Sequence, residues 1–233
     1  SYLHQWGSVF QMYTQDHEGY FHPGWAEPFD PNDVWTHIYR PYFGEEDDFR
    51  TCPCARKVIE GHLNGGSKYA WRGGRGPDDW VGEEDNYGSF GLNAYVCNEQ
   101  AEASWNSNEK EFYWRNINVR GRLNKIPILA DSGYWKVHVS NDNDAPQESD
   151  WLHHHADDPL RAAHENYMSA YCIDRHDGGI NSVFFDLSVR WVSLKSLWTL
   201  KWHRKFDTDG EWTKEGNGGN SPDWPKWMAS FPE

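Results

Sequence analysis

The N-terminal residues set the strongest limit on the fold, because they carry an apolar pattern with the period of a helix. The apolar positions recur three and four residues apart: Leu3, Trp6, Val9, Phe10 and Tyr13. The pattern stops before Gly19, and glycine readily takes the left-handed conformation that closes a helix. We therefore predict a helix over residues 1–16. A helix with one apolar face must bury that face against another element.

The remaining chain carries strand signals that come late and are short. Apolar runs bounded by turn residues predict strands at Phe90–Cys97, Ile126–Ala130, Tyr167–Asp174, Val183–Phe185 and Val189–Val192. The Gly-Gly pair at 178–179 predicts an antiparallel hairpin that joins Tyr167–Asp174 to Val183–Phe185.

These patterns together indicate one α+β domain over residues 1–233. The helix at 1–16 packs on an antiparallel sheet within 17–233, and long Trp- and Gly-rich loops cover the rest. The expected core residues are Trp6, Val9, Phe10, Tyr13, Ile128, Val183, Phe185 and Val189.

Two further short helices are expected. Asp33 is a suitable N-cap for one that ends at Tyr39, because Pro41 follows and proline interrupts a helix. The other lies within Ser193–Trp202, where leucine and tryptophan recur.

The charge of the chain disfavours several classes of partner. Acidic residues number 36 against 22 basic ones, a formal charge of -14 that opposes binding to nucleic acid or to anionic membranes. No apolar stretch approaches the ~20 residues that span a bilayer. The chain starts at Ser1 inside a helical pattern, so we expect that an upstream segment was removed.

Several segments resemble the type IV pilin-like proteins of the planctomycete-type prepilin family. The similarity covers Ser1–Phe21, Tyr113–Asp131, Arg175–Asp186, Val189–Val192, Leu197–His203 and Pro225–Met228. The family has a motif of His, nine residues and Asp-Gly near its C-terminus. His176 and Asp186 keep that spacing, and Leu187 replaces the Gly. The turn after Asp186 is therefore not expected to require a left-handed residue.

This resemblance implies a structural protein rather than an enzyme. It implies a subunit of a type IV pilus or a type II secretion pseudopilus, cut and N-methylated by a prepilin peptidase. The partners would be other copies of the chain and the assembly machinery. The subunit would be exported and anchored in the inner membrane by an apolar helix absent here, and then placed in a periplasmic or cell-surface filament.

The motif residues His176, Asn181 and Asp186 flank the predicted hairpin. Short polar side chains at such places satisfy backbone donors in tight turns, so we expect a structural role for them.

Two segments offer metal ligands, although no cofactor is required by the expected function. Asp207, Asp209 and Glu211 present alternating carboxylates suited to Ca²⁺, but the glycine at 210 does not fit an EF-hand. A solvated turn is the alternative. The histidines at 153–155, with Asp157 and Asp158, suit a transition metal, but adjacent strand residues point to opposite faces.

The cysteines permit two disulfides in an exported protein, and three pairings remain open. They are Cys52, Cys54, Cys97 and Cys172. The spacing of the Cys-Pro-Cys at 52–54 does not match a zinc-binding Cys-x-x-Cys knuckle.

A secreted carbohydrate-binding module is the alternative function. Its candidate sugar-stacking residues are Trp71, Trp80, Trp212 and Trp224. It predicts several exposed, coplanar tryptophans, whereas the pilin interpretation predicts that most tryptophans are buried. The sequence lacks the P-loop, Gly-x-Ser-x-Gly, His-Glu-x-x-His and dinucleotide-binding motifs, which disfavours an enzyme.

Overall fold

The computed structural model of the protein describes residues 2–24, 34–44, 47–60, 64–72, 86–98, 110–141, 143–147 and 167–233. The helices in these ranges are α1 (Tyr2–Asp16), α2 (Trp35–Ile38) and α3 (Arg40–Phe43). The strands are β1 (Trp71–Arg72), β2 (Tyr87–Gly88), β3 (Phe90–Asn93), β4 (Pro127–Asp131), β5 (Lys136–Val137), β6 (Gly179–Phe184) and β7 (Val189–Ser193). The 3₁₀ helices are η2 (Asp47–Arg50), η3 (Ala94–Val96), η5 (Leu123–Lys125), η7 (Tyr167–Ala170), η8 (Leu194–Thr199) and η9 (Lys226–Met228). No helix in this part of the chain has both the length and the apolar character needed to cross a membrane.

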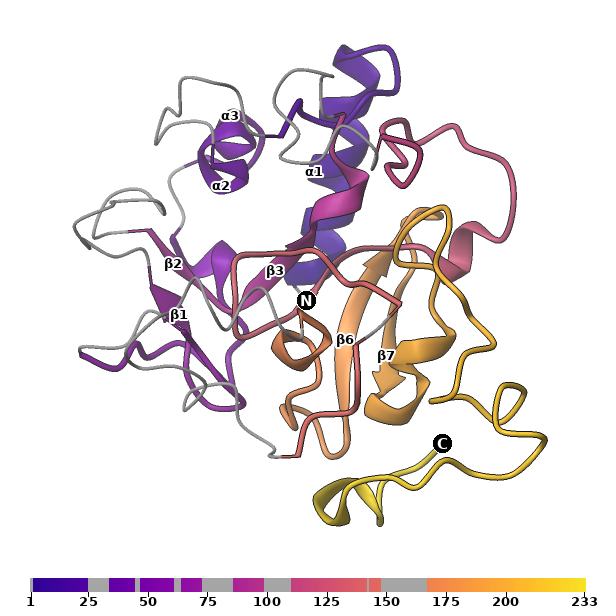
Figure 1. Ribbon diagram of the computed structural model, residues 1–233. Coiled ribbons are helices and arrows are strands. Elements are labelled where there is room, and N and C mark those ends of the chain that lie inside the picture. The colour runs from indigo at the N-terminus through magenta and orange to yellow at the C-terminus, as the bar shows by residue number, and fades with distance from the viewer. Residues whose placement is uncertain are drawn as a thin grey trace.

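Five strands form the main sheet, in the order β5-β3-β4-β6-β7. Its neighbouring strands run antiparallel except β3 and β5, which are parallel. β1 and β2 form a separate antiparallel pair. The α+β class is therefore confirmed, and the sheet is antiparallel as expected except for the β3–β5 pair. The chain after β4 returns to β3 and runs alongside it in the same direction. Figure 1 shows β6 and β7 between α1 above and the C-terminal segment below.

The predicted N-terminal helix is confirmed with its buried face and its end. Its apolar residues Leu3, Trp6, Val9, Phe10 and Tyr13 are all buried, and the helix contacts β6, β7 and α3. The N–H of Gly19, at φ 87°, donates to the carbonyl of Thr14 over 2.7 Å. This left-handed glycine closes the helix as the sequence predicts.

Alternating side chains of the sheet contribute to two hydrophobic clusters. Val183 and Phe185 belong to the cluster that contains α1. Phe184, between them, belongs to the cluster that contains Trp198 and the C-terminal Met228. Alternation along a strand explains this division, because successive side chains point to opposite faces. Of the expected core residues all are buried except Val189, which is half-buried.

The hairpin predicted through Gly178-Gly179 is wrong, and the structure forms a different one between β6 and β7. Tyr167–Asp174 is not a strand, because it begins as η7 and continues without pairing. The hairpin joins β6 to β7 through residues 185–188. Gly178 precedes β6 and Gly179 is its first residue, so this pair does not turn between two strands.

Three shorter predictions are confirmed in part. The helix expected to stop at Pro41 divides into α2 and α3, and Pro41 lies in the first turn of α3, where its missing N–H costs nothing. Asp33 lies outside the described residues. The strand expected at Phe90–Cys97 ends at Asn93, whose side chain caps η3. The helix expected in Ser193–Trp202 is η8.

Candidate functional site

Three side chains that can bind a metal or take part in catalysis converge from distant parts of the chain. Cys52 follows η2, Asp131 ends β4 and His176 precedes β6. His176 Nε2 lies 3.1 Å from Asp131 Oδ2 and 3.5 Å from Cys52 Sγ. Among the residues that the structure describes, this is the only group of three or more His, Cys, Asp or Glu donors that lie within 4.8 Å of one another.

Asp131 is a buried carboxylate with several partners. Arg175 donates to its Oδ1 over 3.2 Å, and both side chains are fully buried. The backbone N–H of Asn181 donates to Oδ2 over 2.8 Å. Burial alone would raise the pKa of Asp131. The hydrogen bond from His176, the charge of Arg175 and the N–H of Asn181 outweigh burial and hold that pKa below its ordinary value.

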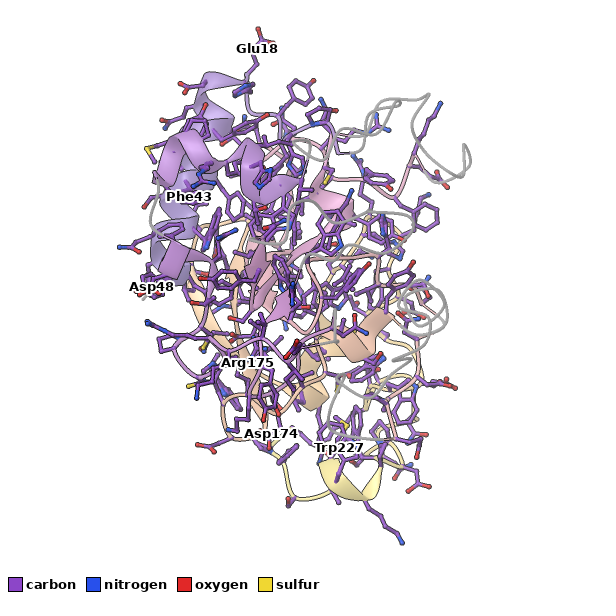
Figure 2. The ribbon with its side chains drawn as sticks, turned by 90° about the vertical axis from the view of Figure 1, so that its left-hand side faces the viewer. Glu18, Phe43, Asp48, Asp174, Arg175 and Trp227 are labelled. Carbon is purple, nitrogen blue, oxygen red and sulfur yellow. The ribbon has the colours of Figure 1, made fainter. Side chains whose placement is uncertain are left out.

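The side chain of Arg175 fixes the position of Asp131 through hydrogen bonds to the carboxylate and to the surrounding backbone. Figure 2 labels Arg175 in the lower half of the view, and its side chain is fully buried. Besides Asp131, its guanidinium donates to backbone carbonyls of three other segments: those of Gly66, Ser67, Ser89 and Ser132. The carboxylate is thereby held rigidly, as a preorganised site requires.

The cluster forms part of the wall of an open surface pocket with a volume of about 360 Å³. The start of α1, from Tyr2 to His4, lines the same pocket together with Cys54 and Trp191. The side chain of His176 is 22% exposed, whereas Asp131 is fully buried. A small solute therefore reaches the cluster from the His176 side.

The Gly178-Gly179 pair positions His176. Asp177 and Gly178 have φ values of 53° and 81°, and the N–H of His176 donates to the carbonyl of Gly179 over 3.0 Å. A Cβ on Gly179 would lie 2.2 Å from the ring of Trp191, whose indole N–H donates to the carbonyl of His176 over 2.9 Å. The glycine thus allows Trp191 to hold the backbone that carries the histidine.

This geometry does not suit nucleophilic catalysis by Cys52. Burial, helped by the charge of Asp131, raises the pKa of Cys52 to about 12, so the sulfur is a thiol near neutral pH. The cysteine and the aspartate also contact the same nitrogen of His176, whereas a catalytic triad uses both ring nitrogens. Metal coordination and a plain hydrogen-bonded network remain as chemical interpretations.

The expected disulfides are not formed. Cys52, Cys54, Cys97 and Cys172 are all free thiols in the structure, and Cys54 alone among them is exposed. Cys97 and Cys172 lie close to other residues: the sulfur of Cys97 is 3.5 Å from Nε2 of His22, and that of Cys172 is 4.0 Å from the sulfur of Met228.

The three motif residues do not form one site. His176 and the backbone of Asn181 meet at Asp131, but Asp186 lies beyond the other end of β6. Asp186 Oδ1 accepts hydrogen bonds from the N–H and the hydroxyl of Ser188, at 3.1 and 2.6 Å. Asp186 therefore stabilises the hairpin loop, which is the role expected from its side chain.

The expectation for Leu187 is wrong, because this residue has a left-handed φ of 62°. The N–H of Leu187 donates to the carbonyl of Phe184, and the N–H of Phe184 donates to the carbonyl of Ser188. This is a three-residue hairpin loop, a type I turn followed by one left-handed residue. The loop geometry imposes the conformation on a leucine.

The candidate calcium ligands do not converge on one site. Asp207, Asp209 and Glu211 are exposed, and Asp207 Oδ1 accepts the N–H of Asp209 over 2.9 Å, as in a solvated turn. They form no three-ligand group in the part of the chain that the structure describes. The histidines at 153–155 with Asp157 and Asp158 lie outside it.

The candidate sugar-stacking tryptophans do not form a platform. Trp71 is buried and donates to the carbonyl of Phe90 over 3.0 Å. Trp212 and Trp224 are half-buried, pack at an angle of 41° to each other and contact Trp198. Trp80 lies outside the described residues.

Comparison of the chain with models of protein families, with curated proteins and with solved structures found no match. The chemistry of the site and the arrangement of the fold are therefore the grounds for any functional proposal.

Proposed function

We propose that this chain is the head of a pilin-like subunit that acts by assembly into a filament. The observation that carries the proposal is the placement of α1. One face of this helix packs on β6 and β7, while its other face and its first turn lie at the surface.

The exposed face of α1 is mostly polar, with Met12 as its large apolar side chain, and is available for a neighbour. His4, Gln5, Ser8, Gln11 and Gln15 are exposed. The first turn borders the open pocket described above, and under this proposal a helix continued upstream of Tyr2 leaves the body there. In an assembled filament, such upstream helices would bury their apolar surface against one another. Head-to-tail contacts of this kind give open helical filaments.

The distribution of tryptophan also supports this proposal over the sugar-binding alternative. Among the described residues, the buried tryptophans are Trp6, Trp35, Trp71, Trp114, Trp135, Trp198 and Trp202. Trp191 is exposed, and the others are half-buried. Stacking on sugars requires several exposed, coplanar rings, whereas an assembling head uses these residues for its core.

The test is to isolate the native protein from its cells and determine its N-terminus by mass spectrometry. We expect a cleaved, N-methylated terminus upstream of Ser1 and recovery of the chain in sheared filaments. An unprocessed terminus together with absence from the filament fraction would refute the proposal.

A pair of variants tests the proposed role of α1. Ser8 and Glu211 are both exposed, but only Ser8 is on the helix. Ser8→Trp should lower the filament yield with unchanged thermal unfolding, because it obstructs the exposed face of α1. Glu211→Trp is the control and should assemble normally. Equal yields from both variants would show that this face makes no filament contact.

A further inference from the structure

The proposed assembly makes no use of the cluster of Cys52, Asp131 and His176. We infer that these three side chains bind one divalent transition-metal ion, with zinc the best fit, and leave a fourth coordination position open to the pocket. The inference is independent of the proposed function, because it rests only on the geometry of these side chains.

The separations of the donor atoms fit a tetrahedral ion. Nε2 of His176 lies 3.1 Å from Oδ2 of Asp131 and 3.5 Å from Sγ of Cys52. With zinc–ligand distances of ~2.0–2.3 Å, these separations correspond to angles at the metal of about 100° and 107°, close to tetrahedral. All three donor atoms already lie within 4.8 Å of one another.

The chemistry of the donors selects the class of metal. One sulfur, one imidazole nitrogen and one carboxylate oxygen suit zinc and its first-row neighbours, whereas Ca²⁺ and Mg²⁺ require oxygen ligands. An ion would displace the thiol proton of Cys52 to solvent and take the place of the proton between Nε2 of His176 and Asp131, leaving a neutral imidazole with its proton on Nδ1. The thiolate and the carboxylate would carry two negative charges beside the ion and the guanidinium of Arg175.

The groups around the cluster resemble the outer shell of a metal site. Ligating carboxylates are usually hydrogen-bonded by further groups that orient them. Here Arg175 holds Oδ1 of Asp131, and the N–H of Asn181 reaches Oδ2. The N–H of Cys52 donates to the hydroxyl of Ser89, which fixes the backbone that carries the sulfur. Two of the three ligands are therefore already oriented in the absence of an ion.

The pocket supplies both an entry path and the fourth position. His176 forms its exposed edge, and Cys54 lies on the same wall with an exposed side chain. Sites with three protein ligands and one open position bind water or a small solute at the metal. Cys54 is the natural control, because it offers a second thiol in the same pocket outside the three-ligand group.

The experiment uses purified, reduced protein freed of metal with a chelator and then titrated with Co²⁺ and Zn²⁺. We expect one equivalent of Co²⁺ to give a thiolate-to-cobalt charge-transfer band and intense visible bands of four-coordinate cobalt, and Zn²⁺ to displace it. Cys52→Ser and His176→Gln should each lower the affinity by more than the ~10–100-fold that loss of an outer-shell partner costs. Cys54→Ser should keep the wild-type affinity and spectrum.

Three results would overturn the inference. They are the absence of a charge-transfer band in the wild-type protein, its persistence in Cys52→Ser, and its loss in Cys54→Ser. Any of the three would leave the cluster as a hydrogen-bonded network only. Asp131 is fully buried, so its variants risk misfolding. The partly exposed His176 avoids that difficulty, and the thermal unfolding of metal-free His176→Gln verifies that the variant is folded.

Discussion

His22 should make the protein sensitive to mild acid. Its side chain is 1% exposed, and its Nδ1 lies 3.0 Å from the hydroxyl of Tyr39. Burial, together with the charge of Lys136, lowers the pKa of His22 from 6.5 to about 3. The imidazole is therefore neutral in the folded protein at pH values where it is protonated in the unfolded chain.

The size and direction of the effect follow from this difference. Because the unfolded state takes up the proton first, the stabilising contribution is complete above pH 6.5 and is lost as the pH falls toward 3. Each pH unit in this window costs about 1.4 kcal/mol. At pH 5 the loss from His22 alone is therefore about 2 kcal/mol, a large share of the ~5–15 kcal/mol that stabilises a typical domain.

The assay is urea unfolding at a series of pH values between 7.5 and 4.5. His22→Gln removes the titrating group, so its free energy of unfolding should depend less on pH, by about 1.4 kcal/mol per unit below pH 6. Tyr39→Phe is the control, because it removes the hydrogen-bond partner but keeps the buried imidazole. It should lower stability at every pH and keep the slope of the wild type. If His22→Gln kept that slope too, or if NMR showed His22 titrating near pH 6.5, the reasoning would be wrong.

Three further predictions concern backbone conformation and buried charge. Leu187→Gly should be more stable than Leu187→Ala by about 1 kcal/mol in chemical unfolding. Both variants lose the leucine side chain, but only alanine keeps the steric strain of a left-handed φ. A more stable alanine variant would contradict the assigned loop. Gly7→Ala in α1 should raise stability by up to about 1 kcal/mol, because its Cβ would meet its neighbours only at ordinary contact distances. Gly91→Ala should lower stability by about 1–3 kcal/mol, because its Cβ would lie 2.4 Å from the carbonyl oxygen of Tyr134. Calorimetry of the two variants side by side checks this, and effects of the same sign would refute it. Arg175→Met should lower the free energy of unfolding by about 3–5 kcal/mol, because it leaves the buried carboxylate of Asp131 unpaired. Adding Asp131→Asn should recover part of that loss in the same assay. A double variant less stable than Arg175→Met would count against the pairing.

The parts of the fold that the sequence predicted are those determined by local pattern. The spacing of Trp6, Phe10 and Tyr13 predicted α1 and its buried face, because a helical period is visible within a few turns. The run around Ile128 predicted β4 for a similar reason. The apolar run from Tyr167 gave a wrong strand, since a short buried run has the same composition in a strand and in a packed turn.

The candidate site could be predicted only in part. The motif points to His176, but its partner Cys52 is 124 residues away, and the Cys-Pro-Cys spacing indicates a disulfide rather than a metal site. Asp131 appeared simply as the end of a strand. Their meeting depends on the pairing of β4 with β6, which brings Asp131 next to the segment that carries His176. Residues that are brought together only by the pairing of distant strands have no characteristic spacing in a single sequence.

The hydrogen bonds of Arg175 also bear on how the molecule opens. One guanidinium connects the backbone at Gly66 and Ser67 with the backbone at Ser89 and Ser132. Near the first of these segments, the amide of Ala70 is bonded to the carbonyl of Lys57 and that of Gly65 to the carbonyl of Gly133. A surface segment usually exchanges its amide protons by local fluctuation. Here such a fluctuation would leave the buried guanidinium of Arg175 without some of its acceptors. The amides of this segment should therefore exchange with deuterium only when those of the central strands do.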